Sequence, residues 1–403
     1  MEHQLHRAKK VALRREVQPC AATLTEEQQI GHSVTAPREG APRRKMIVRA
    51  KSKVDFSAVA RRAGSVLALL LGAFSATGLC AGNPPGSNPV PSIFDPRSAP
   101  ADSVNRNADF VLAICAVIFV VVGTLLVYAV VKFRQTRSNS DREPAQVYGS
   151  NQIETAWTVI PILIVVVLFL ASAREIHSVQ DARRPAGAVE ITVIGHQFWW
   201  EFRYPGFGVV TANELHIPLS DPTHPKPTFL KLMSADTDHS FWIPQLAGKT
   251  DLIPNRVNEM WIEPHETGVF LGQCAQYCGT QHAKMLLRVS VDSPEEFDAW
   301  VHAQRQPANQ DEKGAAGRRV FETTACLNCH AVGGTNGTGR FGPDLTHLMS
   351  RSTLAAGAAE NTTENLRLWI QNPDAIKPGS LMPAMKLSDD ELDALVRYLE
   401  TLR

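Results

Sequence analysis

The sequence predicts a chain of several domains: a pair of membrane-spanning helices, an all-β barrel or sandwich, and a small all-α domain. Three observations lead to this fold class. Two long uncharged apolar runs lie in the first half of the 403 residues, short β-branched and aromatic runs follow them, and helical patterns fill residues 314–403. This length has room for two or three domains. The net charge of +1 gives no reason to expect a nucleic-acid partner.

The two uncharged runs cover residues 110–131 and 155–173 and predict a transmembrane hairpin over 105–175. A helix over the first run would span about 33 Å, against roughly 30 Å of bilayer hydrocarbon. A helix buried in a protein core is the alternative, but neither run has a polar face. The positive-inside rule places the intervening loop in the cytoplasm and the chain after residue 174 on the periplasmic or outer face of a bacterial inner membrane. The basic residues of that loop are Lys132, Arg134, Arg137 and Arg142.

A third apolar run, residues 66–82, follows two arginines and fits a secretory signal peptide over residues 46–81. An uncleaved helix is the alternative. Lipid attachment at Cys80 is disfavoured because the bulky Leu79 precedes it. Met46 opens a basic stretch of the kind that begins signal peptides, so we expect residues 1–45 to be disordered or to precede the true start.

Residues 186–304 are expected to form the β domain, because the segment up to residue 290 shows short strand patterns broken by Gly and Pro. A helix capped by Ser293 closes it. Residues 305–313 are polar and predict a linker. The all-α domain over 314–403 ends in a helix with Ser388 as its cap and Glu391 three residues later.

The seven cysteines are unevenly spaced. An odd number with this spacing is not typical of a disulfide framework, and each close pair indicates a ligand or attachment site. The close pairs are Cys274 with Cys278 and Cys326 with Cys329, and the isolated cysteines are Cys20, Cys80 and Cys115.

The stretch GQCAQYCGTQHAKM, residues 272–285, gathers two thiols, an imidazole and a thioether from Cys274, Cys278, His282 and Met285. Such soft ligands are typical of copper sites. His239, in DTDHSFWIPQ, is the best candidate for a second imidazole. A disulfide between the two cysteines and a zinc site are the alternatives, although the thioether favours copper over zinc.

The motif ACLNCH contains Cys326, Cys329 and His330 at the spacing that attaches c-type haem. A redox cysteine pair or half of a zinc site is the alternative, but no βαβ context surrounds the motif and no second cysteine pair follows it. The stretch GSLMPAMKLSDDEL offers Met382 or Met385 as the sixth iron ligand.

The stretches HSFWIPQLAGKTDLIPNR and GQCAQYCGTQH resemble subunit II of cytochrome c oxidase, which carries the binuclear CuA centre. The resemblance implies a cupredoxin-like Greek-key barrel in which the two cysteines bridge two coppers. Many members have Glu in place of Gln276, and that carboxylate helps bind a magnesium ion. Whether this chain binds magnesium therefore stays open. The implied ligands are the side chains of His239, Cys274, Cys278, His282 and Met285 and the backbone carbonyl of Gln276.

Two further stretches resemble the same family. ETAWTVIP resembles the start of its second transmembrane helix, where Glu154 matches a glutamate near a proton pathway; a solvated acid at a helix start is the alternative. GHQFWWEF resembles the aromatic stretch through which electrons enter CuA, with Phe198 where many members have Trp. Trp199 and Trp200 could equally be packing residues.

The C-terminal domain resembles class I cytochromes c, whose distal methionine commonly precedes proline, and this selects Met382 over Met385. In FGPDL, the carbonyl of Pro343 would orient His330. The fusion resembles caa-type oxidases. This resemblance implies an electron-input subunit without an oxygen-reducing site of its own. Electrons would pass from cytochrome c or a similar donor through one covalent haem c and CuA to subunit I. Subunit III would be a further partner.

Three other functions are alternatives to this one. A nitric oxide or nitrous oxide reductase component is disfavoured by the two-helix anchor and by the absence of a catalytic histidine cluster. A quinol oxidase subunit that keeps the fold without metal is disfavoured by the complete set of side-chain ligands. A free-standing membrane carrier of electrons would differ in lacking a large haem-bearing partner.

Overall fold

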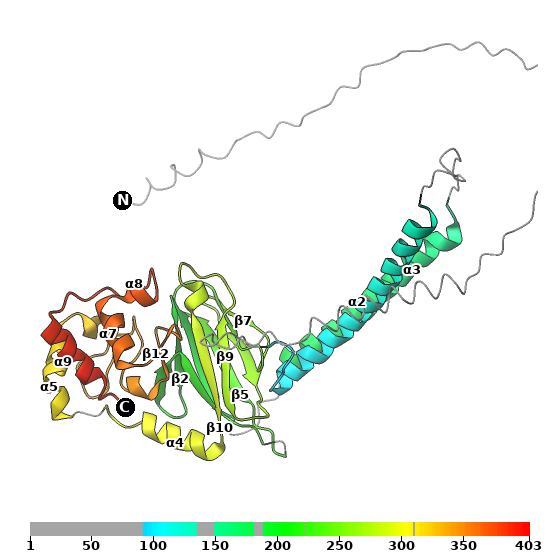
Figure 1. Ribbon diagram of the computed structural model, residues 1–403. Coiled ribbons are helices and arrows are strands. Elements are labelled where there is room, and N and C mark those ends of the chain that lie inside the picture. The colour runs from blue at the N-terminus through cyan, green and yellow to red at the C-terminus, as the bar shows by residue number, and fades with distance from the viewer. Residues whose placement is uncertain (1–91, 135–148, 181–187, 222, 309–310) are drawn as a thin grey trace, which may run out of the picture. The chain divides into compact units, whose positions relative to one another are not determined.

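The computed structural model describes residues 92–134, 149–180, 188–221, 223–308 and 311–403 (Figure 1). They all belong to one compact unit of the chain, Arg62–Arg403. The expectations for residues 1–45 and for a signal peptide over 46–81 lie outside the described residues, as do Arg137 and Arg142 of the basic loop.

Two long helices, α2 (Ala99–Lys132) and α3 (Asn151–Gln180), contact each other and run side by side (Figure 1). Each contains one of the predicted apolar runs, and Pro161 lies inside α3. Their most apolar windows have mean hydropathies of 3.1 and 2.5, and no part of either window is buried. That exposure excludes the alternative of a buried core helix. Both helices are long enough to extend beyond roughly 30 Å of hydrocarbon.

Ten strands form two five-stranded sheets, in the orders β3-β2-β1-β5-β8 and β4-β10-β9-β6-β7. Strands β1 and β5 pair in parallel, as do β4 and β10, and the other pairs are antiparallel. The predicted all-β, cupredoxin-like domain is therefore confirmed. The strands are β1 (Glu190–His196), β2 (Trp199–Tyr204), β3 (Val209–Ala212), β4 (Glu214–Pro218), β5 (Thr228–Ser234), β6 (His239–Trp242), β7 (Thr250–Leu252), β8 (Asn258–Ile262), β9 (Gly268–Cys274) and β10 (Leu286–Asp292).

Alternate side chains from both sheets fill the core between them. Trp200 and Phe202 of β2 meet Phe241 of β6 edge to face, at ring-centroid distances of 5.3 and 6.3 Å. All three are fully buried, and each large apolar side chain of this kind contributes about 1.5–3 kcal/mol. Helix α4 (Pro294–Gln304) packs on this core, and its capping box with Ser293 confirms the predicted helix start. We call β1–β10 with α4 the barrel.

The C-terminal part is helical, as predicted, and we call it the haem domain for the motif it carries. Helix α9 begins after Ser388, whose capping box with Glu391 is present. Its apolar face packs with Phe321 of α5 in a second hydrophobic core. The elements are η2 (Glu312–Gly314), α5 (Ala315–Thr323), α6 (Cys326–Cys329), η3 (Leu348–Ser350), β11 (Thr353–Leu354), β12 (Ala359–Glu360), α7 (Thr363–Gln371), α8 (Pro373–Ile376) and α9 (Asp389–Leu399).

Candidate metal and haem centres

The connection between β9 and β10 holds the soft-ligand residues. Cys274 ends β9, and the chain returns through the short helix η1 (His282–Lys284) to β10. Backbone pairing between the two strands holds the ends of this connection together, since the amide of Cys274 donates to the carbonyl of Met285 at 2.9 Å. His239 comes from a distant part of the sequence. It opens β6, which pairs with β9 through Phe241 and Cys274, so sheet register sets it beside the loop.

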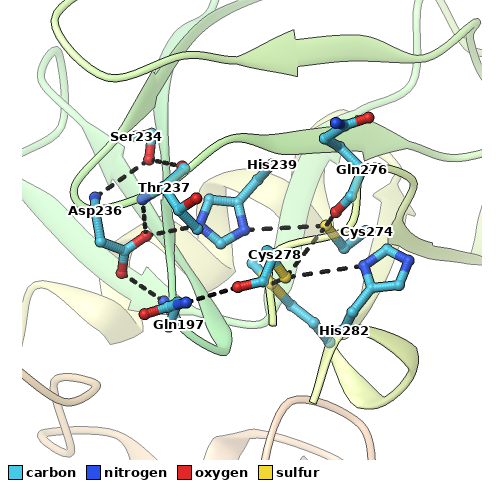
Figure 2. A network of polar contacts seen from close by, with 10 residues as sticks. Gln197, Ser234, Asp236, Thr237, His239, Cys274, Gln276, Cys278 and His282 are labelled. Atoms are coloured by element: carbon cyan, nitrogen blue, oxygen red, sulfur yellow. Dashed lines mark hydrogen bonds and ion pairs between the residues drawn. The ribbon is translucent and has the colours of Figure 1, made fainter. Parts of the chain in front are cut away.

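The predicted copper ligands converge on the two cysteine sulfurs. The Cys274 Sγ lies 3.9 Å from the Cys278 Sγ and 3.9 Å from the His239 Nδ1. On the other side, the Cys278 Sγ lies 3.8 Å from the His282 Nδ1 and 3.9 Å from the Met285 Sδ. Figure 2 shows the sulfurs between the two imidazoles.

The backbone carbonyl of Gln276 also points into this cluster, 3.1 Å from the Cys274 Sγ, while the Gln276 side chain is exposed. His239, Cys274, Cys278 and Met285 are buried, and His282 is half-buried. Both cysteines are free thiols in this structure, so they do not form the alternative disulfide.

Asp236 and Gln197, which the sequence did not predict as site residues, form hydrogen bonds with residues of this cluster. An oxygen of Asp236 lies 2.8 Å from the His239 Nε2, which leaves Nδ1 facing the sulfurs (Figure 2). The other oxygen of Asp236 accepts from the amide of Gln197 at 2.7 Å. The side chain of Gln197 donates to the Cys278 carbonyl at 2.6 Å. The proximity of Asp236 to His239 in the sequence was the available signal for it, and nothing local marked Gln197.

Gly195 of β1 faces His239 at close range. A Cβ built on this residue would lie 2.8 Å from the imidazole Cδ2, closer than side chains normally approach. Glycine therefore allows the buried ring to pack against the backbone of the neighbouring sheet.

The second predicted motif lies on the short helix α6, whose single turn places Cys326 and Cys329 on the same side. His330 follows directly, and its Nδ1 lies 2.7 Å from the carbonyl of Pro343, which confirms the predicted orienting contact. A Cβ on Gly342 would lie 2.4 Å from the His330 ring, so the FGPDL loop needs glycine to approach this imidazole.

An apolar cavity opens beside this motif. Cys326, Cys329 and His330 line it, and so do both candidate methionines, Met382 and Met385. Met385 also packs against the hydrophobic core of the domain, which gives it a structural role that Met382 does not share. The lining also includes two basic side chains, Arg351 and Lys377, and the barrel residues Gln197, Phe198 and Trp199.

Comparison with known proteins identifies the family. Residues 91–174 match the cytochrome c oxidase subunit II transmembrane domain, residues 224–292 match its periplasmic domain, and residues 314–403 match cytochrome c. The cytochrome c oxidase subunit 2 of Alkalihalophilus pseudofirmus is 36% identical over 319 residues, 77% of this chain and 91% of the relative. The chain belongs to the cytochrome c oxidase subunit II family, with a cytochrome c domain fused at its C-terminal end.

Two other relatives agree. The subunits 2 of Bacillus sp. strain PS3 and Bacillus subtilis are 32% and 33% identical, over 67% and 68% of this chain and 80% and 82% of theirs. This subunit II is therefore a membrane protein with an extramembrane part, and it is one component of an oxidoreductase complex that includes subunit I.

Electrostatics around the sulfurs of this subunit II favours one thiolate. The hydrogen bond with Cys278 lowers the pKa of Cys274 to about 3, against the opposing effect of burial. The same contact raises the pKa of Cys278. Burial acts to lower the pKa of His239, but the hydrogen bonds with Asp236 and Cys274 outweigh it and raise that pKa. The donor set of two sulfurs, two imidazoles, a thioether and a carbonyl fits copper better than zinc.

The haem site also fits its group. The cavity is apolar, it opens onto the paired cysteines, and histidine and methionine side chains face it. Burial lowers the pKa of His330, which keeps the imidazole neutral and able to act as a ligand.

The aromatic stretch divides into two roles in this subunit II. Trp200 is fully buried, with its ring centroid 6.1 Å from that of His239, and is part of the core. Trp199 stacks on His196 at 4.2 Å and lines the haem cavity together with Phe198. Glu154 lies exposed in the first turn of α3, and its role in a proton pathway stays a prediction.

Proposed function

We propose that this chain is the electron-input subunit of a respiratory haem-copper oxidase. It accepts electrons from cytochrome c or a similar donor through a covalent haem c and a binuclear CuA centre. It passes them to subunit I, where oxygen is reduced to water. The observation that carries the proposal is the convergence of His239, His282 and Met285 on the paired sulfurs of the β9–β10 connection.

The distribution of donors supports two metal ions with shared sulfurs. His239 stands beside Cys274, whereas His282 and Met285 stand beside Cys278, so the other ligands approach the sulfur pair from both sides. The Gln276 carbonyl would be a further ligand. When bound, copper and haem supply one-electron redox chemistry, and the protein contributes ligand identity, orientation and exclusion of water.

In the haem domain, Cys326 and Cys329 would form the two thioether links, and His330 and Met382 would hold the iron. The contact of the His330 Nδ1 with the Pro343 carbonyl fixes the tautomer that leaves Nε2 free for a metal. A methionine ligand raises the potential of such a centre, which suits a domain that receives electrons from a high-potential donor.

The helical hairpin supports a proposal for the cellular setting of the chain. We propose a multi-pass protein of a bacterial inner membrane, with the barrel and the haem domain on the periplasmic or outer face. Subunit I, and subunit III with it, would contact the chain in the membrane. The basic residues between α2 and α3 support this orientation.

Optical and electron paramagnetic resonance spectra of the purified chain, matured in a host that attaches c haem, test the proposal. We expect the mixed-valence signature of two equivalent coppers together with a low-spin c haem. Cys278→Ser should abolish the copper signal and leave the haem spectrum unchanged. A metal analysis without copper would favour the scaffold role of quinol oxidases, and purification without subunit I would favour a free-standing carrier.

A further inference from the structure

Lys377 is a buried cation whose role the proposed electron path leaves unexplained. It follows α8 in the haem domain, and it is 3% exposed. Its Nζ donates to the Phe198 carbonyl at 2.7 Å and to the Ala355 carbonyl at 3.1 Å, and the described residues give it no carboxylate partner. Burial lowers the pKa of this ammonium to about 7. Such burial is costly, so the two carbonyl hydrogen bonds must offset it.

The two carbonyls belong to different domains. Phe198 lies between β1 and β2 of the barrel, and Ala355 lies between β11 and β12 of the haem domain. Lys377 and Phe198 both line the haem cavity, so this ammonium joins the domains where the barrel closes the cavity.

The copper-ligand loop contacts the same segment of the haem domain. The side chain of Gln281 donates to the carbonyl of Pro378, next to Lys377. The Nζ of Lys284 donates to the carbonyl of Ile376 at 2.7 Å. Gln281 and Lys284 flank His282 in the sequence. The loop that carries this copper ligand is thus hydrogen-bonded, before and after His282, to the segment that leads to Met382.

A second contact lies on the barrel at Glu214, which is 8% exposed. Its carboxylate accepts four hydrogen bonds from the haem domain: from the amide and hydroxyl of Ser352 at 2.9 and 2.8 Å, and from those of Thr353 at 2.9 and 2.7 Å. Trp199 and Ala212 of the barrel pack with Ala356 of the haem domain in a separate buried cluster. The domains therefore share a buried interface whose polar contacts include those at Lys377 and at Glu214.

We propose that Lys377 is a positioning residue: together with Glu214 it fixes the haem domain on the barrel in the arrangement that allows electrons to cross directly between haem and copper. The inference rests on the proposed function. Electron transfer falls steeply with distance, so loss of this arrangement slows the crossing even where both centres are intact. The linker alone would hold the domains near each other without fixing their orientation.

The test compares the wild-type chain with Lys377→Met, which keeps most of the side-chain length but removes the ammonium donor from two buried carbonyls. Lys386→Met is the matched control, because Lys386 is exposed in the same segment. One readout is the haem-to-copper electron transfer rate after rapid reduction of the haem. The other is amide hydrogen exchange at Leu286, Ser352 and Thr353, whose amides donate across the interface.

For Lys377→Met we expect native haem and copper spectra, electron transfer slowed about tenfold or more, and faster exchange at the three interface amides. Exchange within α9 should stay as in the wild type, whereas a general loss of folding would raise it too. Lys386→Met should match the wild type. Unchanged transfer and unchanged interface exchange in Lys377→Met would overturn the proposal.

Glu214→Ala is the second test, for the case in which Lys377→Met fails to take up haem. Glu214 does not line the haem cavity, so its loss should leave haem binding intact. It should slow the transfer and raise exchange at Ser352 and Thr353, and an unchanged rate would count against the fixed interface. A wild-type chain without either redox centre would instead contradict the proposed function itself.

Discussion

Asp236 lies behind the copper-ligand cluster and contacts His239 directly. Its carboxylate lies 2.8 Å from the Nε2 of His239, and its second oxygen accepts from the amide of Gln197. Asparagine can keep only part of this arrangement, because its NH₂ group cannot accept a hydrogen bond. We expect Asp236→Asn to weaken copper binding about 10- to 100-fold, measured by competition with a copper chelator.

Asp238→Asn is the control for that loss of charge, because Asp238 is exposed and directly precedes His239 in the sequence. It should bind copper as the wild type does. If both variants lose affinity equally, the effect is one of general charge and the orienting role of Asp236 is wrong.

Gly195 sets how closely β1 approaches His239. Gly195→Ala would place a Cβ 2.8 Å from the imidazole of the fully buried His239, so the ring or β1 would have to shift. We expect altered copper hyperfine splitting in the paramagnetic resonance spectrum and weaker copper binding, with the haem spectrum unchanged. Gly206→Ala, where nothing lies within 4 Å of a new Cβ, should leave both spectra as they are.

Among the elements, the junction of β10 with β4 and α4 depends on an ionised carboxylate. Burial acts to raise the pKa of Asp292, but hydrogen bonds with His216 and Ser290 outweigh it and lower this pKa below its ordinary value of 3.8. His216 also stacks on Trp300 of α4 at 4.4 Å. The pair therefore stabilises the barrel above about pH 3.8, and this contribution is lost as pH falls through the lowered pKa.

Asp292→Asn should lower the free energy of unfolding of the barrel at pH 7 by about 1–3 kcal/mol. The difference from the wild type should shrink below about pH 3.8, as wild-type Asp292 takes up its proton. Urea titrations of the full chain followed by tryptophan fluorescence measure this. Asp298→Asn, at an exposed position of α4, is the control, and a difference that persists unchanged in acid would contradict the assignment.

These elements also show what the sequence could predict. Cys274, Cys278, His282 and Met285 lie in one connection, so local spacing was enough to group them. The capping boxes of α4 and α9 were equally local. Partners that only the sheet and the domain packing bring together carried no local signal: Gln197 meets the Cys278 carbonyl from 81 residues away, and Lys377 meets Phe198 from 179.

For the whole molecule, the haem domain is held on the barrel by direct contacts as well as by the linker. The linker gives proximity, but the hydrogen bonds of Lys377 and Glu214 select one orientation. The barrel itself is tied to the helical hairpin, since the indole of Trp261 donates to the Val179 carbonyl of α3 at 2.6 Å. The orientation of the hairpin in the membrane therefore determines on which face the barrel and the haem domain meet an electron donor.

Sided labelling tests that orientation. With the isolated cysteines at 20, 80 and 115 replaced by serine, we expect a cysteine at Arg134, just after α2, to react with a membrane-impermeant maleimide only when the cytoplasmic face is open to the reagent. A cysteine at Asp298, exposed on α4, should react only from the opposite face. Intact spheroplasts and inverted vesicles provide the two faces. Labelling of both positions from the same side would contradict a two-helix hairpin, and labelling of Asp298 from the cytoplasmic side would leave the barrel on the wrong side for a periplasmic donor.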